Sequence, residues 1–205
     1  FPVVPVAIIV FMVVIALGAD LLAPHNPEVG SLGMRFKPPV WQSGGSAAHL
    51  LGTDHLGRDV LSRVIHGARV SLLVGFSAVV VGGLIGSTLG IIAGFRGGLT
   101  DTVIMTVADA QLAFPFILLA IGIIAVLGPS FPNLVIVVGL SGWVTYARVL
   151  RSQVLSLRRR EFVDAILGLG GSVPRVIVRH ILPNVASTLM VIATLELARA
   201  IVLEA

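Results

Sequence analysis

Cysteine is absent from this 205-residue chain, and the only lysine is Lys37. Without cysteine the chain has no disulfide framework, no thiolate zinc site and no cysteine nucleophile. A nucleotide-binding loop of the form Gly-x4-Gly-Lys-Ser/Thr is also excluded, because the single lysine follows Phe36 rather than a glycine. The chain is therefore not itself a P-loop ATPase, and we predict no catalytic residue in it.

Charged residues are also scarce, at 12%, whereas 56% of the residues are hydrophobic. A soluble domain has about twice that charged fraction, so the composition indicates an integral membrane protein. The net charge of +4 arises mainly from arginines between residues 148 and 179. Such a local excess indicates orientation in a bilayer and not nucleic-acid binding.

Five apolar segments are long enough to cross a bilayer, which takes about 17–25 helical residues. They are residues 3–23, 70–93, 102–127, 133–149 and 185–203. The predicted fold is an all-α polytopic transmembrane domain over residues 1–205. A cleaved signal peptide is the alternative for the first segment, but no basic stretch precedes it, so we predict a span. Because the chain starts at Phe1 and not at Met, we expect that the natural protein begins earlier.

Glycine and proline shape two of these spans. Gly82, Gly86 and Gly90 recur every four residues, a spacing that allows close helix–helix approach in lipid. Pro115 removes a backbone hydrogen bond in the middle of the third span and predicts a kink. A gating hinge and a static kink are both consistent with this proline.

Residues 24–69 form the longest polar stretch. Asp59 is a candidate N-cap for a short helix that we expect to lie along the membrane interface, with Arg58, Arg63 and Arg69 near lipid phosphates. Four histidines lie in this stretch, at spacings of 24, 6 and 11 that match no compact metal motif, so we predict solvated or interfacial histidines and no metal site. They are His25, His49, His55 and His66.

The orientation follows from the arginines. Seven arginines lie from Arg148 to Arg179, which predicts a cytoplasmic loop over residues 150–184. Counting spans backward then places residues 24–69 outside, 94–101 inside and 128–132 outside.

Within the cytoplasmic loop, residues 161–184 predict two short helices joined by a glycine turn. On the first helix, four apolar residues share one face: Phe162, Ala165, Ile166 and Leu169. Ser172 is a candidate cap for the second helix, and Pro183 is expected to end it. A stripe of four apolar residues marks that second helix: Val176, Ile177, Ile181 and Leu182. A polar hairpin with an apolar face suits docking onto another protein, although an ordinary surface hairpin is the alternative.

This hairpin resembles the coupling loop of ABC importer permeases, whose pattern is Glu-Ala-Ala, three residues, Gly, nine residues, then Ile-x-Leu-Pro. Asp164, Ala165 and Ile166 take the first three positions, with Asp for Glu and Ile for Ala. Gly170 takes the glycine, and His180 stands where the pattern has Ile. The resemblance implies contact with an ATPase subunit through Glu161, Phe162, Asp164, Ala165, Gly168, Gly170, His180, Leu182 and Pro183. We expect a Gly170→Asp variant to insert into the membrane but to uncouple transport from ATP hydrolysis.

A second motif narrows the family. Residues 52–72 resemble the stretch before the second span of dipeptide, oligopeptide and nickel importer permeases. Twelve positions match: Gly52, Thr53, Asp54, Gly57, Arg58, Asp59, Ser62, Arg63, Gly67, Arg69, Ser71 and Leu72. Together the two resemblances cover the whole chain. They imply a sixth span beyond residue 205 and a location in the bacterial inner membrane.

The resemblance also implies partners. These are a homologous second permease, two ATPase subunits that bind ATP and magnesium, an extracytoplasmic solute-binding protein, and membrane lipid. No cofactor is expected in this chain itself. Peptides are the expected cargo, with nickel, glutathione or another small solute as alternatives.

Charged residues within spans are costly and are therefore candidates for function. Asp109, Glu196 and Arg199, with Pro115, are candidate residues of the translocation path. Glu196 and Arg199 lie three residues apart, so a structural ion pair that pins helix packing is the alternative for them. For Asp109, the alternative is a structural bond to a neighbouring residue. An ion-coupled secondary transporter that uses Asp109 and Glu196 is the alternative mechanism.

A small motif in the fourth span raises a different class. Gly139-Leu140-Ser141-Gly142 has the form found at the nucleophile of rhomboid-type intramembrane proteases. Such a serine needs a histidine base within hydrogen-bond reach. No histidine falls inside a predicted span, so we interpret Ser141 as a packing residue and keep the protease only as an unfavoured alternative.

Overall fold

The computed structural model describes residues 3–204 and divides the chain into two compact units, which meet between Leu73 and Val74. Over the described residues all regular structure is helical, apart from two isolated β-bridges, Ser46 with His49 and Thr53 with Asp59. The predicted all-α fold is confirmed. Because the boundary between the units falls inside a single helix, the assignment of residues 1–205 to one domain stays a prediction.

The first unit contains α1 (Val3–Leu17), α2 (Ala19–Leu22), the 3-10 turn η1 (Leu32–Met34) and the start of α3 (Val60–Arg96). The 15 residues of α1 extend about 22 Å, which is less than the ~30 Å of a bilayer core. The region between η1 and α3 is irregular, and its shape depends on glycines. Gly57 has a φ of +73°, and a Cβ there would lie 1.9 Å from the carbonyl oxygen of Ser31.

The predicted separate interfacial helix before the second span is wrong. Instead, α3 begins at Val60 and runs unbroken for 37 residues through that span. Asp59 does act as its cap, because the Asp59 carboxylate accepts a 2.8 Å hydrogen bond from the backbone N–H of Ser62. Gly67 is the weakest helix former at the expected boundary, and its cost of about 1 kcal/mol is too small to end a helix.

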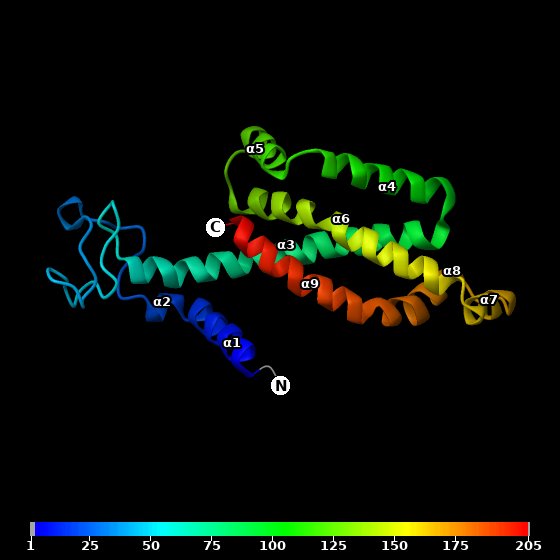
Figure 1. Ribbon diagram of the computed structural model, residues 1–205, viewed down its shortest axis with the longest axis horizontal. Coiled ribbons are helices and arrows are strands. Elements are labelled where there is room, and N and C mark those ends of the chain that lie inside the picture. The colour runs from blue at the N-terminus through cyan, green and yellow to red at the C-terminus, as the bar shows by residue number, and fades with distance from the viewer. Residues whose placement is uncertain (1–2, 205) are drawn as a thin grey trace. The chain divides into compact units, whose positions relative to one another are not determined.

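The second unit contains the rest of α3 and the helices that follow it. These are α4 (Gly98–Ala113), α5 (Phe116–Leu127), α6 (Phe131–Arg158), α7 (Glu161–Gly168), α8 (Val173–Val176), the π-helical turn η2 (Ile177–Ile181) and α9 (Leu182–Glu204). In Figure 1, α9 runs alongside α6, and α7 lies at the end of the bundle where α6 finishes. Within residues 3–204, three helices are long and apolar enough to cross a membrane: α3, α6 and the continuous helix of residues 173–204. If the bent pair of α4 and α5 forms one span, the number is four.

The close helix–helix approach predicted for the glycine stripe of α3 is confirmed, and the structure shows that its partner is α6. A Cβ on Gly82, Gly86 or Gly90 would lie only 2.6, 2.2 or 2.5 Å from a carbonyl oxygen of α6. Glycine at these positions lets the two helix backbones touch, and any larger residue would force the two helices apart.

Pro115 produces a break and not merely a kink. The third predicted span is divided into α4 and α5, which are bent by 92° with respect to each other. Phe114 has an extended backbone (φ −90°, ψ 133°), the conformation favoured before proline. A gating hinge and a static turn at Pro115 both stay predictions.

Candidate coupling hairpin and polar residues of the spans

The hairpin of residues 161–183 packs against the spanning helices of the second unit through a buried apolar face. Val163, Val176 and Ile181 are fully buried. They belong to a core cluster completed by Ile91, Phe95, Leu150, Val154 and Val185. These partners lie on α3, α6 and α9, so the hairpin is packed against the spanning helices as part of the same core.

The predicted apolar face of α7 is only partly correct. Ile166 packs toward the core together with Val163, one turn away, whereas Phe162, Ala165 and Leu169 are exposed. Leu169 is 89% exposed at the tip of the hairpin. Because α7 has apolar residues on two faces, the sequence pattern could not show which face the bundle would cover.

The polar coupling residues lie on the exposed side with these apolar residues. Glu161, Asp164 and Gly168 are all exposed, and both carboxylates fall in the first turns of α7. Negative charge near a helix N-terminus is favoured by the helix dipole. The hairpin therefore presents a mixed acidic and apolar surface away from its buried face.

Gly170 occupies the position that the turn geometry requires. Its φ is +83°, a region in which a residue with a Cβ is strained. The turn is a Schellman motif. The N–H of Gly171 donates to the carbonyl oxygen of Ile166 at 2.9 Å, and the N–H of Gly170 donates to the carbonyl oxygen of Leu167 at 3.0 Å. A Cβ on Gly170 would meet nothing within 4 Å, so the positive φ of the backbone, and not a clash with a neighbour, constrains this site.

Gly171 is a constrained residue that sequence reasoning missed. A Cβ there would lie 2.5 Å from Cγ2 of Ile166 and 2.7 Å from the carbonyl oxygen of the same residue. The two consecutive glycines were the available signal. In a Schellman turn, the residue after the one with positive φ, here Gly171, lies close to the last turn of the preceding helix, here α7.

The prediction that Pro183 ends the second hairpin helix is wrong. Residues 173–204 form one continuous helix that joins the hairpin to α9. The π turn η2 precedes the proline, and the N–H of Leu182 donates to the carbonyl of Ile177 five residues earlier. Nearby, Nδ2 of Asn184 donates to the carbonyl of His180 at 2.7 Å. The widened turn before the proline allows the helix to continue past it without that N–H.

His180 and Leu182 lie at the junction of the hairpin and α9. The rings of His180 and Phe162 have centroids 6.1 Å apart, so the structure brings these two predicted coupling residues together. Leu182 and Pro183 are both exposed. All nine predicted coupling residues are thus on or near one connected hairpin, and their contact with an ATPase stays a prediction.

Asp109, in α4, forms an ion pair with Arg148 of α6. A second pair links the same two helices, because Arg151 donates through two nitrogens to the Asp101 carboxylate. Sequence reasoning assigned both arginines to the cytoplasmic cluster and missed these pairings. The paired residues lie 39 and 50 residues apart in the sequence, so no local pattern marks these pairs.

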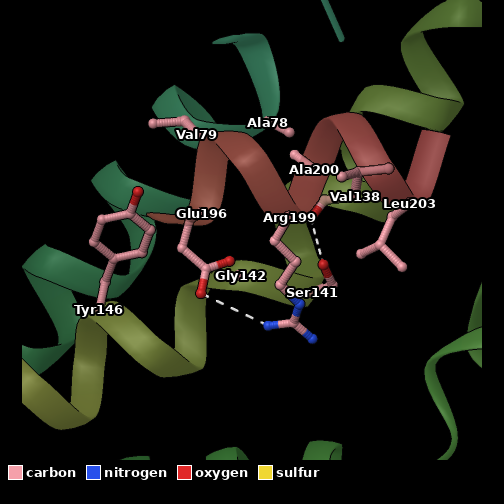
Figure 2. Close-up of a pocket in the computed structure, with 10 residues that line it drawn as sticks. All are labelled: Ala78, Val79, Val138, Ser141, Gly142, Tyr146, Glu196, Arg199, Ala200 and Leu203. Atoms are coloured by element: carbon pink, nitrogen blue, oxygen red, sulfur yellow. Dashed lines mark hydrogen bonds and ion pairs between the residues drawn. The ribbon is translucent and has the colours of Figure 1, made fainter. Parts of the chain in front are cut away.

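Glu196 and Arg199 form the predicted ion pair, with 3.6 Å between Oε1 and Nη1. Figure 2 shows both side chains beside Ser141 and Gly142 of α6, in a pocket that Tyr146 also lines. Arg199 also lines a second pocket, together with Pro115 and Gln111. The structure therefore brings three of the four translocation candidates into adjoining pockets and places Asp109 in a separate ion pair.

Ser141 has the contacts of a packing residue. Its hydroxyl donates a 2.7 Å hydrogen bond to the carbonyl of Val138 in its own helix (Figure 2). Histidine is not among the residues that line either pocket at Ser141. These pockets offer no general base for a serine nucleophile.

In the first unit, Asp54 binds two of the three arginines of the 52–72 motif, Arg58 and Arg63. Its carboxylate accepts hydrogen bonds from the backbone N–H groups of Leu56 and Arg58, at 2.8 and 2.9 Å, and from the side chains of Arg58 and Arg63. Burial raises the pKa of Asp54, but these hydrogen bonds and the Arg58 charge outweigh it and hold the pKa well below its usual value. Arg69 pairs with Asp20 at 2.9 Å. The three arginines that we expected near lipid phosphates are thus paired with carboxylates in the structure.

Comparison with known proteins agrees with both motifs. A family model described as "binding-protein-dependent transport system inner membrane component" matches residues 86–205. The di/tripeptide transport system permease protein DppC of Pseudomonas aeruginosa is 41% identical over 196 residues, which cover 94% of this chain and 65% of that protein. The dipeptide transport system permease protein DppC of Alkalihalophilus pseudofirmus is 42% identical over 95% of this chain and 62% of its own length.

A third relative is the oligopeptide transport system permease protein OppC of Bacillus subtilis, which is 37% identical over 97% of this chain and 63% of its own length. The chain therefore spans a little under two thirds of the length of these relatives. The family match covers more than half of the chain and includes the hairpin and the polar residues of the spans. This chain belongs to the family of inner membrane components of binding-protein-dependent transport systems.

Proposed function

We propose that this chain is a membrane subunit of an ATP-driven importer, in which the hairpin of residues 161–183 transmits movement from ATPase subunits to the spanning helices. ATP and magnesium would bind to those partner subunits. A homologous second permease and an extracytoplasmic solute-binding protein would complete the system. The named relatives are permeases for di/tripeptides, dipeptides and oligopeptides, which supports a peptide as cargo.

One observation carries this proposal: the hairpin is buried on one side and exposed on the other. Val163, Val176 and Ile181 pack into the core of the spanning helices, whereas Phe162 and Leu169 project outward. The second hairpin helix also continues without a break into α9. A force applied to the exposed side would therefore move α9 and not merely bend a loose loop.

The pockets around Arg199 support a translocation path through this subunit. Glu196 and Arg199 come from α9, and Pro115 comes from the α4–α5 break. Charged groups inside a membrane protein favour sites that face a path or a partner. We infer that cargo or water passes on this side, next to a second permease.

The first test is purification of the whole protein from its host in mild detergent, followed by mass spectrometry. We expect a P-loop ATPase, a second permease and a solute-binding protein to co-purify. A protein that purifies alone and moves solute under an ion gradient would contradict the proposal.

The second test replaces the exposed tip residue with a charge. Leu169→Asp should leave insertion and folding intact, because the side chain is 89% exposed, but should reduce ATP-driven uptake about tenfold or more. Leu99→Asp is the matched control, since Leu99 is 85% exposed on α4, outside the hairpin. Equal uptake by the two variants would remove the coupling role of the hairpin tip.

A further inference from the structure

Two histidines and an aspartate converge in the first unit, although 34 residues separate the outer two in sequence. Nδ1 of His49 lies 2.9 Å from Oδ1 of Asp59, and Nδ1 of His25 lies 3.9 Å from the same oxygen. The two imidazole rings have centroids 4.8 Å apart. One ligand-type atom from each residue lies within 4.8 Å of the other two.

The carboxylate of Asp59 is fully buried and held in a fixed orientation. Its Oδ2 atom accepts hydrogen bonds from the backbone N–H of Ser62 at 2.8 Å and from the Ser62 hydroxyl at 2.7 Å. These bonds leave Oδ1 facing both imidazoles. The Ser62 hydroxyl also accepts a 3.0 Å hydrogen bond from the backbone N–H of His25, so one serine positions two of the three residues.

The burial of the three side chains grades from inside to outside. Asp59 is 0% exposed, His49 is 14% exposed and His25 is 42% exposed. An ion could enter from the His25 side, and the same opening leaves room for a water molecule as a further ligand. Three protein ligands with one open position are typical of zinc sites that are not purely structural.

The distances suit a tetrahedral ion after small side-chain movements. Zinc binds imidazole nitrogen and carboxylate oxygen at about 2.0–2.2 Å, which places neighbouring ligand atoms roughly 3.3 Å apart. The 2.9 and 3.9 Å separations lie on either side of that value. Imidazole nitrogen favours zinc and similar transition metals over magnesium or calcium, which prefer oxygen.

We propose that His25, His49 and Asp59 form a binding site for a divalent transition-metal cation of the Zn²⁺ type. The ion joins the start, the middle and the end of the irregular segment between α2 and α3 (residues 23–59). This segment has little apolar core, so a metal clamp would fix its fold. The site is independent of the proposed transport function. The competing explanation is a metal-free His49–Asp59 hydrogen bond that only supports the cap of α3.

The test is calorimetric titration of the whole purified protein with Zn²⁺ after removal of bound metal by a chelator. A purification tag without histidine is essential. We expect one Zn²⁺ to bind per chain and to raise the melting temperature, whereas Mg²⁺ should do neither. Melting of the metal-bound and chelator-treated protein gives a second readout.

Three variants separate the metal site from the hydrogen bond. His25→Gln alters the most exposed ligand, so we expect normal folding and a Zn²⁺ affinity lower by about tenfold or more, since even outer-shell changes cost that much. Asp59→Asn retains a good helix cap but loses the charged ligand, and should weaken binding similarly. His55→Gln is the control, because this exposed histidine lies in the same segment outside the cluster.

Two results would overturn the proposal. Absence of saturable Zn²⁺ binding by the wild-type protein would leave only the hydrogen bond. Equal Zn²⁺ affinity of His25→Gln and His55→Gln would place any bound metal elsewhere. If Asp59→Asn does not fold, His25→Gln still decides, because its side chain is 42% exposed.

Discussion

The segment of residues 24–59, predicted to lie outside the membrane and called the outer segment below, precedes α3, and the hairpin of residues 161–183 leads into α9. Different forces hold these two regions. In the outer segment, side-chain oxygens organise the chain: Asp54 accepts hydrogen bonds from Leu56 and Arg58, and Thr53 accepts one from Lys37. In the hairpin, Val163 and Val176 are fully buried in an apolar cluster. Polar bonds fix a shape locally, whereas apolar packing makes a loop part of the bundle.

This difference matches the two tasks. A hairpin that must transmit movement benefits from many non-directional contacts with the helices it moves, because these contacts resist separation in every direction. A segment that only has to keep its own shape can rely on a few directional bonds. Each of those bonds then depends on one side chain, so the outer segment is the more vulnerable to single polar substitutions.

The largest expected effect comes from a charge placed in the apolar anchor of the hairpin. Val163→Asp would bury an unpaired carboxylate at a position that is 0% exposed. We expect a loss of stability of about 3 kcal/mol or more, measured by thermal unfolding in detergent. Ala165→Asp, on the exposed side of the same helix, is the control and should be close to neutral. Equal melting of both variants would mean that α7 is not anchored to the bundle.

A smaller effect is expected from removal of a single polar anchor in the outer segment. Asp59→Ala removes the cap of α3 and should cost about 1–2 kcal/mol. Hydrogen exchange followed by mass spectrometry should show faster exchange over residues 24–62, with residues 161–183 unchanged. Faster exchange in the hairpin as well would contradict the separation of the two regions. Asp59→Asn, which retains the cap, is the matched variant.

The smallest effect is expected from acid. Burial raises the pKa of Asp59, but hydrogen bonds from Ser62 and His49 and the charge of His25 lower it by more, so the net shift of the pKa is downward. The pKa of Asp54 is also lowered. A carboxyl whose folded-state pKa is depressed contributes stability above its unfolded pKa of about 4, and loses it as the pH falls through the folded value. The outer segment should therefore loosen below about pH 4.

The apolar anchor of the hairpin contains no ionisable group, so acid should leave its packing intact. Exchange corrected for the intrinsic pH dependence of amide chemistry, measured at pH 6 and again below about pH 4, tests both statements. If the hairpin loosens at the same pH as the outer segment, or at a higher pH, the proposed difference between the two regions is contradicted.

Some features could be predicted because they depend on local chemistry. Gly170 was predicted from its place in a motif, and its φ of +83° gives the physical reason. Gly82, Gly86 and Gly90 predicted a close helix–helix contact because small residues at that spacing allow backbones to approach in lipid, and the structure supplied α6 as the partner. The Glu196–Arg199 pair followed from helical spacing alone.

Other features depended on contacts between distant segments. The partner of Asp109 is Arg148, 39 residues away, and the partners of Asp59 are His49 and His25. Pro183 misled the prediction because a π turn before it can absorb a missing hydrogen bond, and a π turn has no reliable sequence signal. Pro115 was recognised as a disruption, but the 92° bend depends on how α5 packs against α6.

The sequence by itself determined the membrane class, most of the span positions, the family motifs and the turn glycines. Hydrophobic length, charge scarcity and backbone constraints act over a few neighbouring residues and can be read directly from the chain. Only the tertiary structure decided which face of α7 is buried, which charges on different helices pair, and that His25, His49 and Asp59 meet. Those outcomes depend on which segments pack together, and no local pattern in the chain contains that information.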